Sequence, residues 1–172
     1  TDDVLRDLDE SSDETNEFVN LANTTGPVPI IVQADELAVA ASVTVQETVK
    51  VDRVWAVCDA GLVVNPDGAR NQLEGGALQA CSWTLMETMK IDRHNGPLGL
   101  DWSSYPILSF SDQPTVRAVL IEADDSPPLG AGECAQGPVV AAIANALRDA
   151  VGLRVRDLPL TRERLMQAAA DS

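Results

Sequence analysis

The sequence predicts a mixed α/β domain in which a mixed sheet packs with two long helices. Segments rich in β-branched and apolar residues alternate with stretches of helical periodicity. Each of the two longest helical stretches follows a strand-like segment after a polar or glycine-rich connection. The chain has 172 residues, of which 45% are hydrophobic, and this is enough to bury a core.

The sheet should contain at least three strands. Apolar and small residues alternate from 37 to 45, and β-branched and aromatic residues dominate from 51 to 58. Residues 46 to 50 would connect these two strands. A third strand is expected from 115 to 123, where apolar residues occupy both faces, so we expect it to be covered on both sides.

A long helix is expected from Asn65 to about Met89. The Asn65 side chain can accept a hydrogen bond from a free backbone amide, and Pro66 fits the first turn. Apolar residues then recur at helical spacing. Gly75 and Gly76 each cost about 1 kcal/mol relative to alanine, which suggests that another segment needs to approach closely there.

The second long helix and a short one follow nearer the C-terminus. The second long helix spans 139 to 151, is apolar on nearly all sides and so should be buried, and ends at Gly152 as its C-cap. Thr161 can cap a short helix that extends through Met166. Residues 91 to 113 should form an ordered loop with short strands, since they are rich in Gly, Pro and Ser.

The charge distribution divides the chain into an acidic tail, residues 1–18, and a folded domain, residues 19–172. The tail is expected to be solvated or to form a lone helix. The formal net charge of -15 disfavours nucleic acid and anionic membranes as partners. No stretch approaches the roughly 20 apolar residues that cross a bilayer, so we expect no membrane insertion by this chain.

Cysteine and histidine usage limits the possible chemistry. The three cysteines are too widely separated for a paired disulfide framework or a thiolate metal site. A reducing compartment, the cytoplasm, is therefore the simpler expectation, with periplasmic association left open. The single histidine, His94, lies in a turn-like context, so we expect no protein ligand to a metal. Neither the serines nor Cys134 has a recognisable activating base, which disfavours a hydrolase.

The segment from Gly130 to Pro138 is the main candidate site. Its glycines let the backbone approach a ligand, and the following helix presents unpaired amides to an anion. A phosphate-bearing or metal-oxo cofactor would suit it. Glu133 lies inside this loop, where partial burial beside a cofactor would give it the proton affinity of a general base. The alternative is a structural turn with a surface glutamate, which is the commoner case for short glycine-rich motifs.

A second polar cluster lies between the second strand and the long helix. It could orient a ligand or another segment, whereas helix capping and solvation are the simpler alternative. Its members are Asp59, Gly61, Asn65, Gln72 and Glu74.

Three stretches of the chain occur in a specific order and spacing: "VDRVWAVCDAGLVVNPDGARNQLEGGALQACSWTLMETM", "DWSSYPILSFSDQPTVRAVLIE" and "PPLGAGECAQGPVVAAIANALRDAVGLRVRDLPLT". Together they cover residues 51 to 161. They resemble the C-terminal region of the large subunit of the xanthine dehydrogenase and aldehyde oxidase family, the molybdenum hydroxylases. Within it, "NPDGARNQLEGG", "SWTL" and "DWSSYPIL" look most like the molybdopterin-binding subunit of nicotinate dehydrogenase and isoquinoline 1-oxidoreductase.

The resemblance implies that residues 19–172 are part of the C-terminal molybdopterin-binding domain of such a subunit. The implied cofactor is molybdopterin with molybdenum, in the cytosine dinucleotide form, with iron-sulfur clusters in a partner subunit. Gly130, Ala131 and Gly132 would lie against this cofactor. Glu133 would be the catalytic base that takes a proton from a hydroxyl on the molybdenum.

The implied function is that of an oxidoreductase that hydroxylates an N-heteroaromatic or aldehyde substrate, with water as the oxygen source. Asn65, Gln72 and Glu74 would be supporting structure. The partners would be a small-molecule substrate, the iron-sulfur subunit and the remainder of the molybdenum subunit. The upstream cofactor-binding segments of the family are absent here, so the chain alone should be inactive. The alternative is a non-catalytic fragment that keeps the fold but acts in assembly or partner binding.

Overall fold

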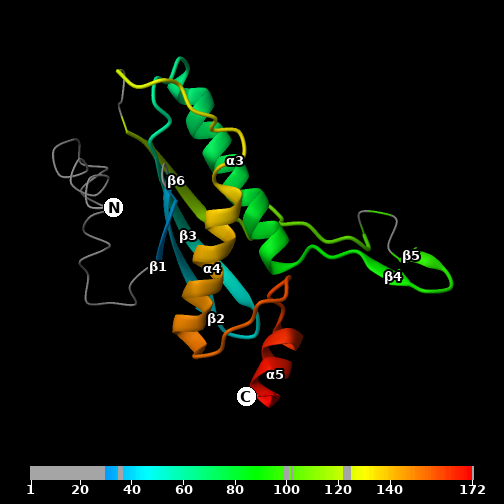
Figure 1. Ribbon diagram of the computed structural model, residues 1–172. Helices are drawn as coiled ribbons and strands as arrows, with labels where there is room; N and C mark the ends of the chain where they lie inside the picture. Colours follow the sequence, from blue (N-terminus) through cyan, green and yellow to red (C-terminus); the bar gives the residue numbers. More distant parts are fainter. Residues whose placement is uncertain (1–29, 35–36, 99–100, 102, 122–124, 172) are drawn as a thin grey trace.

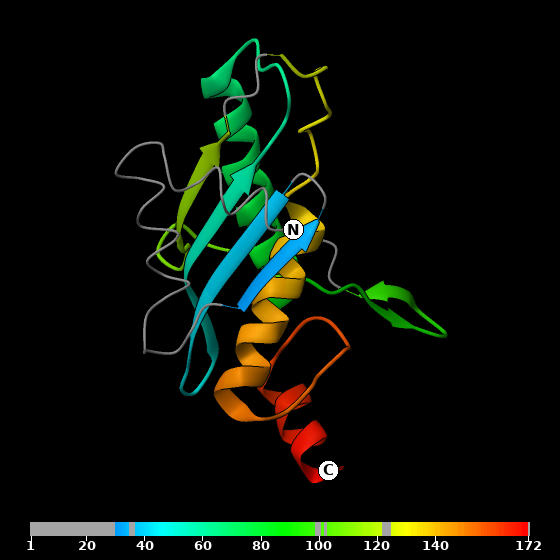
Figure 2. The same cartoon turned by 60° about the vertical axis from the view of Figure 1, so that its left-hand side comes forward.

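The computed structural model of the chain describes residues 30–34, 37–98, 101, 103–121 and 125–171. The acidic tail predicted for residues 1–18 lies outside this part of the chain. Within the described residues, a four-stranded mixed sheet carries two long helices on one face, which confirms the predicted fold class (Figures 1 and 2).

The sheet has the strand order β1-β2-β3-β6. Strands β1 (Ile30–Ala34), β2 (Leu37–Val45) and β3 (Val49–Cys58) follow one another in antiparallel pairs. Strand β6 (Thr115–Leu120) lies parallel to β3, with Cys58 beside Leu120. Parallel neighbours end at the same edge of a sheet, so the segments that leave β3 and β6 meet there.

All three predicted strands are observed, together with β1, which was not predicted, and β6 ends at Leu120 rather than at residue 123. Two further differences concern the start of β3 and the burial of β6. Strand β3 begins at Val49 rather than at residue 51 because Val45 pairs with Val49, which leaves a shorter connection. Strand β6 was expected to be covered on both sides, but only its Ala118 is buried. The reason is that β6 is the edge strand of the sheet.

Helix α3 (Pro66–Leu85) starts as predicted, with the Asn65 side chain accepting a 3.0 Å hydrogen bond from the Gly68 amide. It ends before Met89 because the backbone leaves the helical region at Met86, where φ is -146°. Strands β4 (Lys90–Asp92) and β5 (Gly96–Leu98) then form a separate hairpin that extends away from the sheet (Figure 1).

Helix α4 (Gln136–Val151) begins three residues earlier than expected and ends at Gly152, whose φ of 73° confirms the predicted C-cap. Only one side of α4 is buried, because only that side faces the sheet and α3; Arg148 and Asp149 on the other side are exposed. Helix α5 (Arg162–Ala170) follows its predicted cap, Thr161, and continues past Met166.

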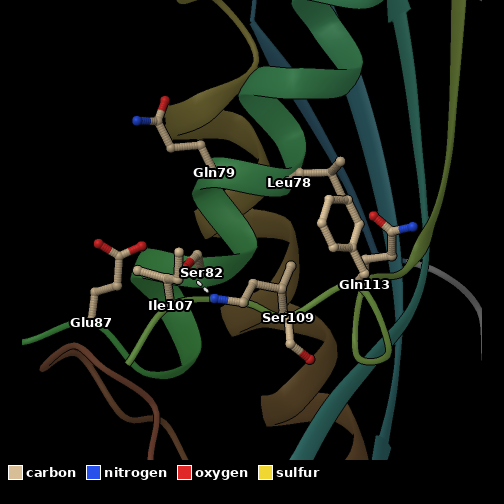
Figure 3. A pocket seen from close by; sticks show the side chains of 9 residues that line it. Leu78, Gln79, Ser82, Glu87, Ile107, Ser109 and Gln113 are labelled. Carbon is tan, nitrogen blue, oxygen red and sulfur yellow. Dashed lines mark hydrogen bonds between the residues drawn. The ribbon is translucent and has the colours of Figure 1, made fainter. Parts of the chain in front are cut away.

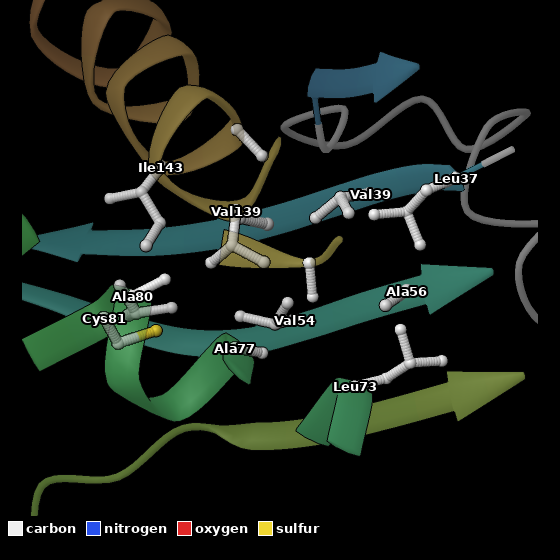
Figure 4. Packing of buried hydrophobic residues seen from close by; sticks show 14 of the residues in the cluster. Leu37, Val39, Val54, Ala56, Leu73, Ala77, Ala80, Cys81, Val139 and Ile143 are labelled. Carbon is white, nitrogen blue, oxygen red and sulfur yellow. The ribbon is translucent and has the colours of Figure 1, made fainter. Parts of the chain in front are cut away.

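The main hydrophobic core fills the space between the sheet and the two long helices (Figure 4). Burying each Val, Leu or Ile side chain of this kind contributes about 1.5–3 kcal/mol. Since α3 and α4 both pack on it, this core fixes the α3 and α4 axes relative to the strand ends. Its fully buried members include Val39, Val54, Leu73, Val139 and Ile143.

Candidate active site

The candidate loop, residues 130–135, belongs to the connection between β6 and α4. This connection starts at the end of the sheet where β3 and β6 both terminate. The last register pair is Cys58 with Leu120, and the Ile121 amide donates to the Cys58 carbonyl at 2.9 Å. The chain after β3 therefore lies beside the chain after β6. The topology thus brings together the two polar clusters that the sequence placed far apart.

Backbone hydrogen bonds attach the loop to the segment that follows β3. The Leu62 amide donates to the Ser126 carbonyl at 3.1 Å, and the Leu129 amide donates to the Ala60 carbonyl at 2.9 Å. Between them, Gly61 has a φ of 61°. A Cβ at this position would lie 2.0 Å from the Pro127 carbonyl oxygen, so only glycine fits there.

Two glutamines of α3 contact the chain on either side of Glu133. The Gln72 side-chain amide donates to the Gly132 carbonyl at 2.7 Å. The Gln136 side-chain amide donates to the Gln79 side-chain oxygen at 3.1 Å. The expected supporting role of Gln72 thus has a defined geometry, a direct hydrogen bond to the loop backbone.

The loop leaves space and hydrogen-bond donors for an anionic group. Gly130 and Gly132 are exposed, and a Cβ at either position would have nothing within 4 Å. The N-cap residue of α4, Ala135, makes no side-chain hydrogen bond to the first turn of the helix. The first amides of a helix point outwards with a partial positive charge. This end of α4 therefore fits an anion, such as a phosphate-bearing or metal-oxo cofactor.

Glu133 is exposed in the bend that precedes α4. The sequence predicted that the Glu133 carboxylate would be partly buried, and among the described residues it is not. The physical reason is that α3 supports the loop from one side only. Ala131 and Cys134 are half-buried, with the Cys134 Sγ 3.7 Å from the Ala131 carbonyl oxygen.

The remaining polar candidates have structural contacts. Asp59 accepts a 2.9 Å hydrogen bond from the Gly61 amide, and Asn65 caps α3. Glu74 is half-buried on α3, and His94 is exposed in the β4–β5 turn. Among the residues that the structure describes, no group of three or more His, Cys, Asp or Glu side chains could hold a metal ion.

Sequence analysis missed Gln79 and Gln136. A signal was present, because Gln72 and Gln79 are seven residues apart and so lie on one face of a helix. Gln79 also lines a groove of about 300 Å³ between α3 and the 107–113 segment. Figure 3 shows this groove, where the Ser82 hydroxyl accepts a 2.9 Å hydrogen bond from the Leu108 amide.

Comparison with known proteins assigns the chain to the molybdopterin-binding domains. Residues 15–114 match the family model described as "Molybdopterin cofactor-binding domain". The chain belongs to this family and is a member of the molybdenum hydroxylases. The matched range ends at residue 114, upstream of the Gly130–Glu133 loop.

Known relatives agree with this assignment. The chain is 41% identical over 120 residues to a nicotinate dehydrogenase subunit of Pseudomonas putida, covering 70% of this chain and 10% of that protein. It is 36% identical over 129 residues to the aldehyde oxidoreductase molybdenum-binding subunit PaoC of Escherichia coli, covering 72% of this chain and 18% of that subunit.

Among solved structures, quinoline 2-oxidoreductase of Pseudomonas putida 86 superposes with a TM-score of 0.70 at 27% identity. The match covers 78% of this chain and 18% of that one. The chain therefore spans between 10% and 18% of the length of these relatives. In the described part of the chain, no helix is long and apolar enough to cross a membrane.

Proposed function

We propose that this chain is part of the molybdenum-binding catalytic subunit of an oxidoreductase. The enzyme would hydroxylate an N-heteroaromatic or aldehyde substrate, with water as the source of oxygen. The supporting observation is the Gly130–Glu133 loop, which is docked on α3 through Gln72 and leads into the uncapped start of α4. The family match supplies the cofactor class.

The cofactor would be held by backbone rather than by side-chain ligands. Gly130, Ala131 and Gly132 would present their backbone to it, and the open space at the two glycines admits a close approach. When bound, the molybdenum cofactor supplies the oxidising centre at which oxygen is transferred to the substrate. We propose the cytosine dinucleotide form of the pterin.

Glu133 would act as the general base. Its carboxylate would accept the proton that the attacking oxygen loses, and its exposure on this chain leaves it free to face a bound reactant. The remainder of the molybdenum subunit would enclose the site. Iron-sulfur clusters in a partner subunit would remove the electrons.

The three cysteines form no disulfide in the described part of the chain, which favours a reducing compartment, the cytoplasm.

The second candidate is a non-catalytic fragment that keeps the fold and acts in assembly or partner binding. The exposed position of Glu133 in the described residues fits it, since a glutamate poised as a general base is more often partly buried. Such a fragment would fold without affinity for the cofactor. Molybdenum and pterin analysis of the protein purified from its host separates the two. Molybdenum with additional subunits supports the catalytic proposal, and a folded metal-free monomer supports the fragment.

The role of Glu133 is tested by Glu133→Gln in the assembled holoenzyme. Turnover should fall by roughly 10²–10⁴-fold with the molybdenum content unchanged, because proton removal is lost while the shape of the side chain is kept. Glu163→Gln, at an exposed glutamate of α5, is the matched control and should leave turnover unchanged. Near-normal turnover of the Glu133 variant would remove this residue from the mechanism.

A further inference from the structure

Gln72 and Gln79 of α3 contact the chain on both sides of Glu133. Gly132, the acceptor of the Gln72 hydrogen bond, immediately precedes Glu133. Gln136, the partner of Gln79, follows it by three residues. Two turns separate the glutamines on α3, so both side chains leave the same face of the helix. The segment that contains the proposed base is therefore held at two points.

We propose that Gln72 and Gln79 are positioning residues that fix the direction of the Glu133 carboxylate. This inference rests on the proposed function, because it matters only if Glu133 is the general base. It then names the residues that hold this base in a fixed direction. The loop needs an external constraint because Gly130 and Gly132 have no Cβ, and a Cβ at either position would have nothing within 4 Å to restrain it. A general base speeds a reaction largely because the protein holds it in the right orientation. A base on a flexible loop loses much of this rate enhancement.

The two contacts are not equivalent. Gln72 holds a backbone carbonyl at 2.7 Å, and this atom is one peptide unit from the Glu133 Cα. Gln79 instead meets the flexible Gln136 side chain at 3.1 Å. The start of α4 is also held by packing, since Ala135 is only 2% exposed. Loss of the Gln72 hydrogen bond should therefore release Glu133 more than loss of the Gln79 contact.

The experiment uses Gln72→Met in the assembled holoenzyme. Methionine matches the length of glutamine, is neutral and cannot donate to the Gly132 carbonyl. We expect kcat to fall about ten- to a hundredfold, with KM and molybdenum content unchanged, because the base is misdirected while substrate binding remains. Gln79→Met should cause a smaller loss. Asn71→Leu, at the exposed neighbour of Gln72, is the matched control and should change neither constant.

A second measurement reports on the loop without using activity. Backbone hydrogen exchange of residues 130–134 should be faster in Gln72→Met than in the parent enzyme or in Asn71→Leu, both with cofactor and without it. Unchanged exchange would overturn the inference, because the hydrogen bond would not constrain the loop. A parallel loss of kcat and molybdenum would also overturn it, since Gln72 would then act in cofactor retention.

The outcomes also separate this inference from the proposed function. If Glu133→Gln abolishes turnover while Gln72→Met leaves kcat unchanged, the proposed function stands and the positioning role fails. If Glu133→Gln keeps near-normal turnover, Glu133 is not the general base. The positioning role then fails as well, even if Gln72→Met shows faster hydrogen exchange in residues 130–134.

Discussion

Gly61 and Pro127 are in direct backbone contact at the edge of the sheet where β3 and β6 end. A Cβ on Gly61 would lie 2.0 Å from the Pro127 carbonyl oxygen and 2.9 Å from its carbonyl carbon. The contact joins the segment after β3 to the loop after β6, and Gly61 has a φ of 61°. The position of the candidate loop thus depends on a residue without a side chain.

Gly61→Ala should destabilise the 172-residue chain by about 2–5 kcal/mol. The left-handed backbone costs an alanine about 1–2 kcal/mol, and forcing the Cβ against Pro127 adds roughly 1–3 kcal/mol. Urea denaturation followed by circular dichroism would measure the free energy of unfolding.

Gly75→Ala is the matched control for this change. Gly75 lies inside α3, where a Cβ would have nothing within 4 Å. The same substitution should therefore stabilise the chain there, by up to about 1 kcal/mol, since alanine is the better helix former. If both variants shifted the free energy of unfolding in the same direction, the steric account of Gly61 would be wrong.

Ser82 of α3 forms the hydrogen bond that holds the 107–113 segment against this helix. This side chain is buried, and its hydroxyl accepts a 2.9 Å hydrogen bond from the Leu108 amide. Ser82→Ala would leave that amide without its partner and should cost about 1–3 kcal/mol in free energy of unfolding. Ser109→Ala should cost less than Ser82→Ala, because Ser109 is exposed and its hydrogen bonds, to Ser111 and Asp112, stay within the segment. Equal losses would contradict the assigned role of Ser82.

The sequence predicted three of the four strands of the sheet and the start of α3 because local signals determine them. Strand β2 matches its predicted bounds, and Asn65 with Pro66 defines the start of α3 through a local cap. The end of α3 was predicted too late. Its last turn is decided by long-range partners, since the Leu160 amide donates to the Thr84 carbonyl at 2.6 Å. No local pattern contains that information.

The candidate site was predictable in its parts but not in its assembly. The glycines and Glu133 are adjacent in the sequence, and the motif blocks identified the family. The hydrogen bond of Gln72 to Gly132 joins residues 60 positions apart. It depends on the parallel pairing of β3 with β6, which composition does not reveal. The exposure of Glu133 likewise follows from packing on one side only.

The Asp101 carboxylate should titrate well below its ordinary range. Hydrogen bonds from the Ser103 and Ser104 hydroxyls, both at 2.7 Å, lower the Asp101 pKa from 3.8 to about 2. A lowered pKa stabilises the charged form in the folded chain. The contribution of this turn is therefore present above about pH 4 and is lost as the pH falls through about 2.

Carboxyl carbon NMR would follow this titration directly, with Asp101→Asn used to assign the signal. Ser103→Ala should move the Asp101 pKa upwards, because it removes the largest cause of the shift. A titration midpoint near 3.8 in the parent chain would contradict the hydrogen-bond geometry of this turn.

The cysteines should report on the candidate loop through their reactivity. Burial raises the Cys81 pKa to about 12 from 9.0, so its thiolate is roughly a thousandfold rarer than that of a free thiol. Cys134 is half-buried and directly follows Glu133. Iodoacetamide should therefore modify Cys134 in the folded protein well before Cys81, and mass spectrometry of the digested protein would give the two rates.

The same labelling tests where the cofactor binds. If molybdopterin lies against Gly130 to Gly132, as proposed, it covers the loop that ends at Cys134, and cofactor-loaded enzyme should label Cys134 more slowly than cofactor-free enzyme. Cys81 lies in the core between α3 and the sheet, so its rate should be equal in the two forms. Equal Cys134 rates with and without cofactor would place the pterin away from this loop, whereas a Cys134-specific difference would support the proposed site.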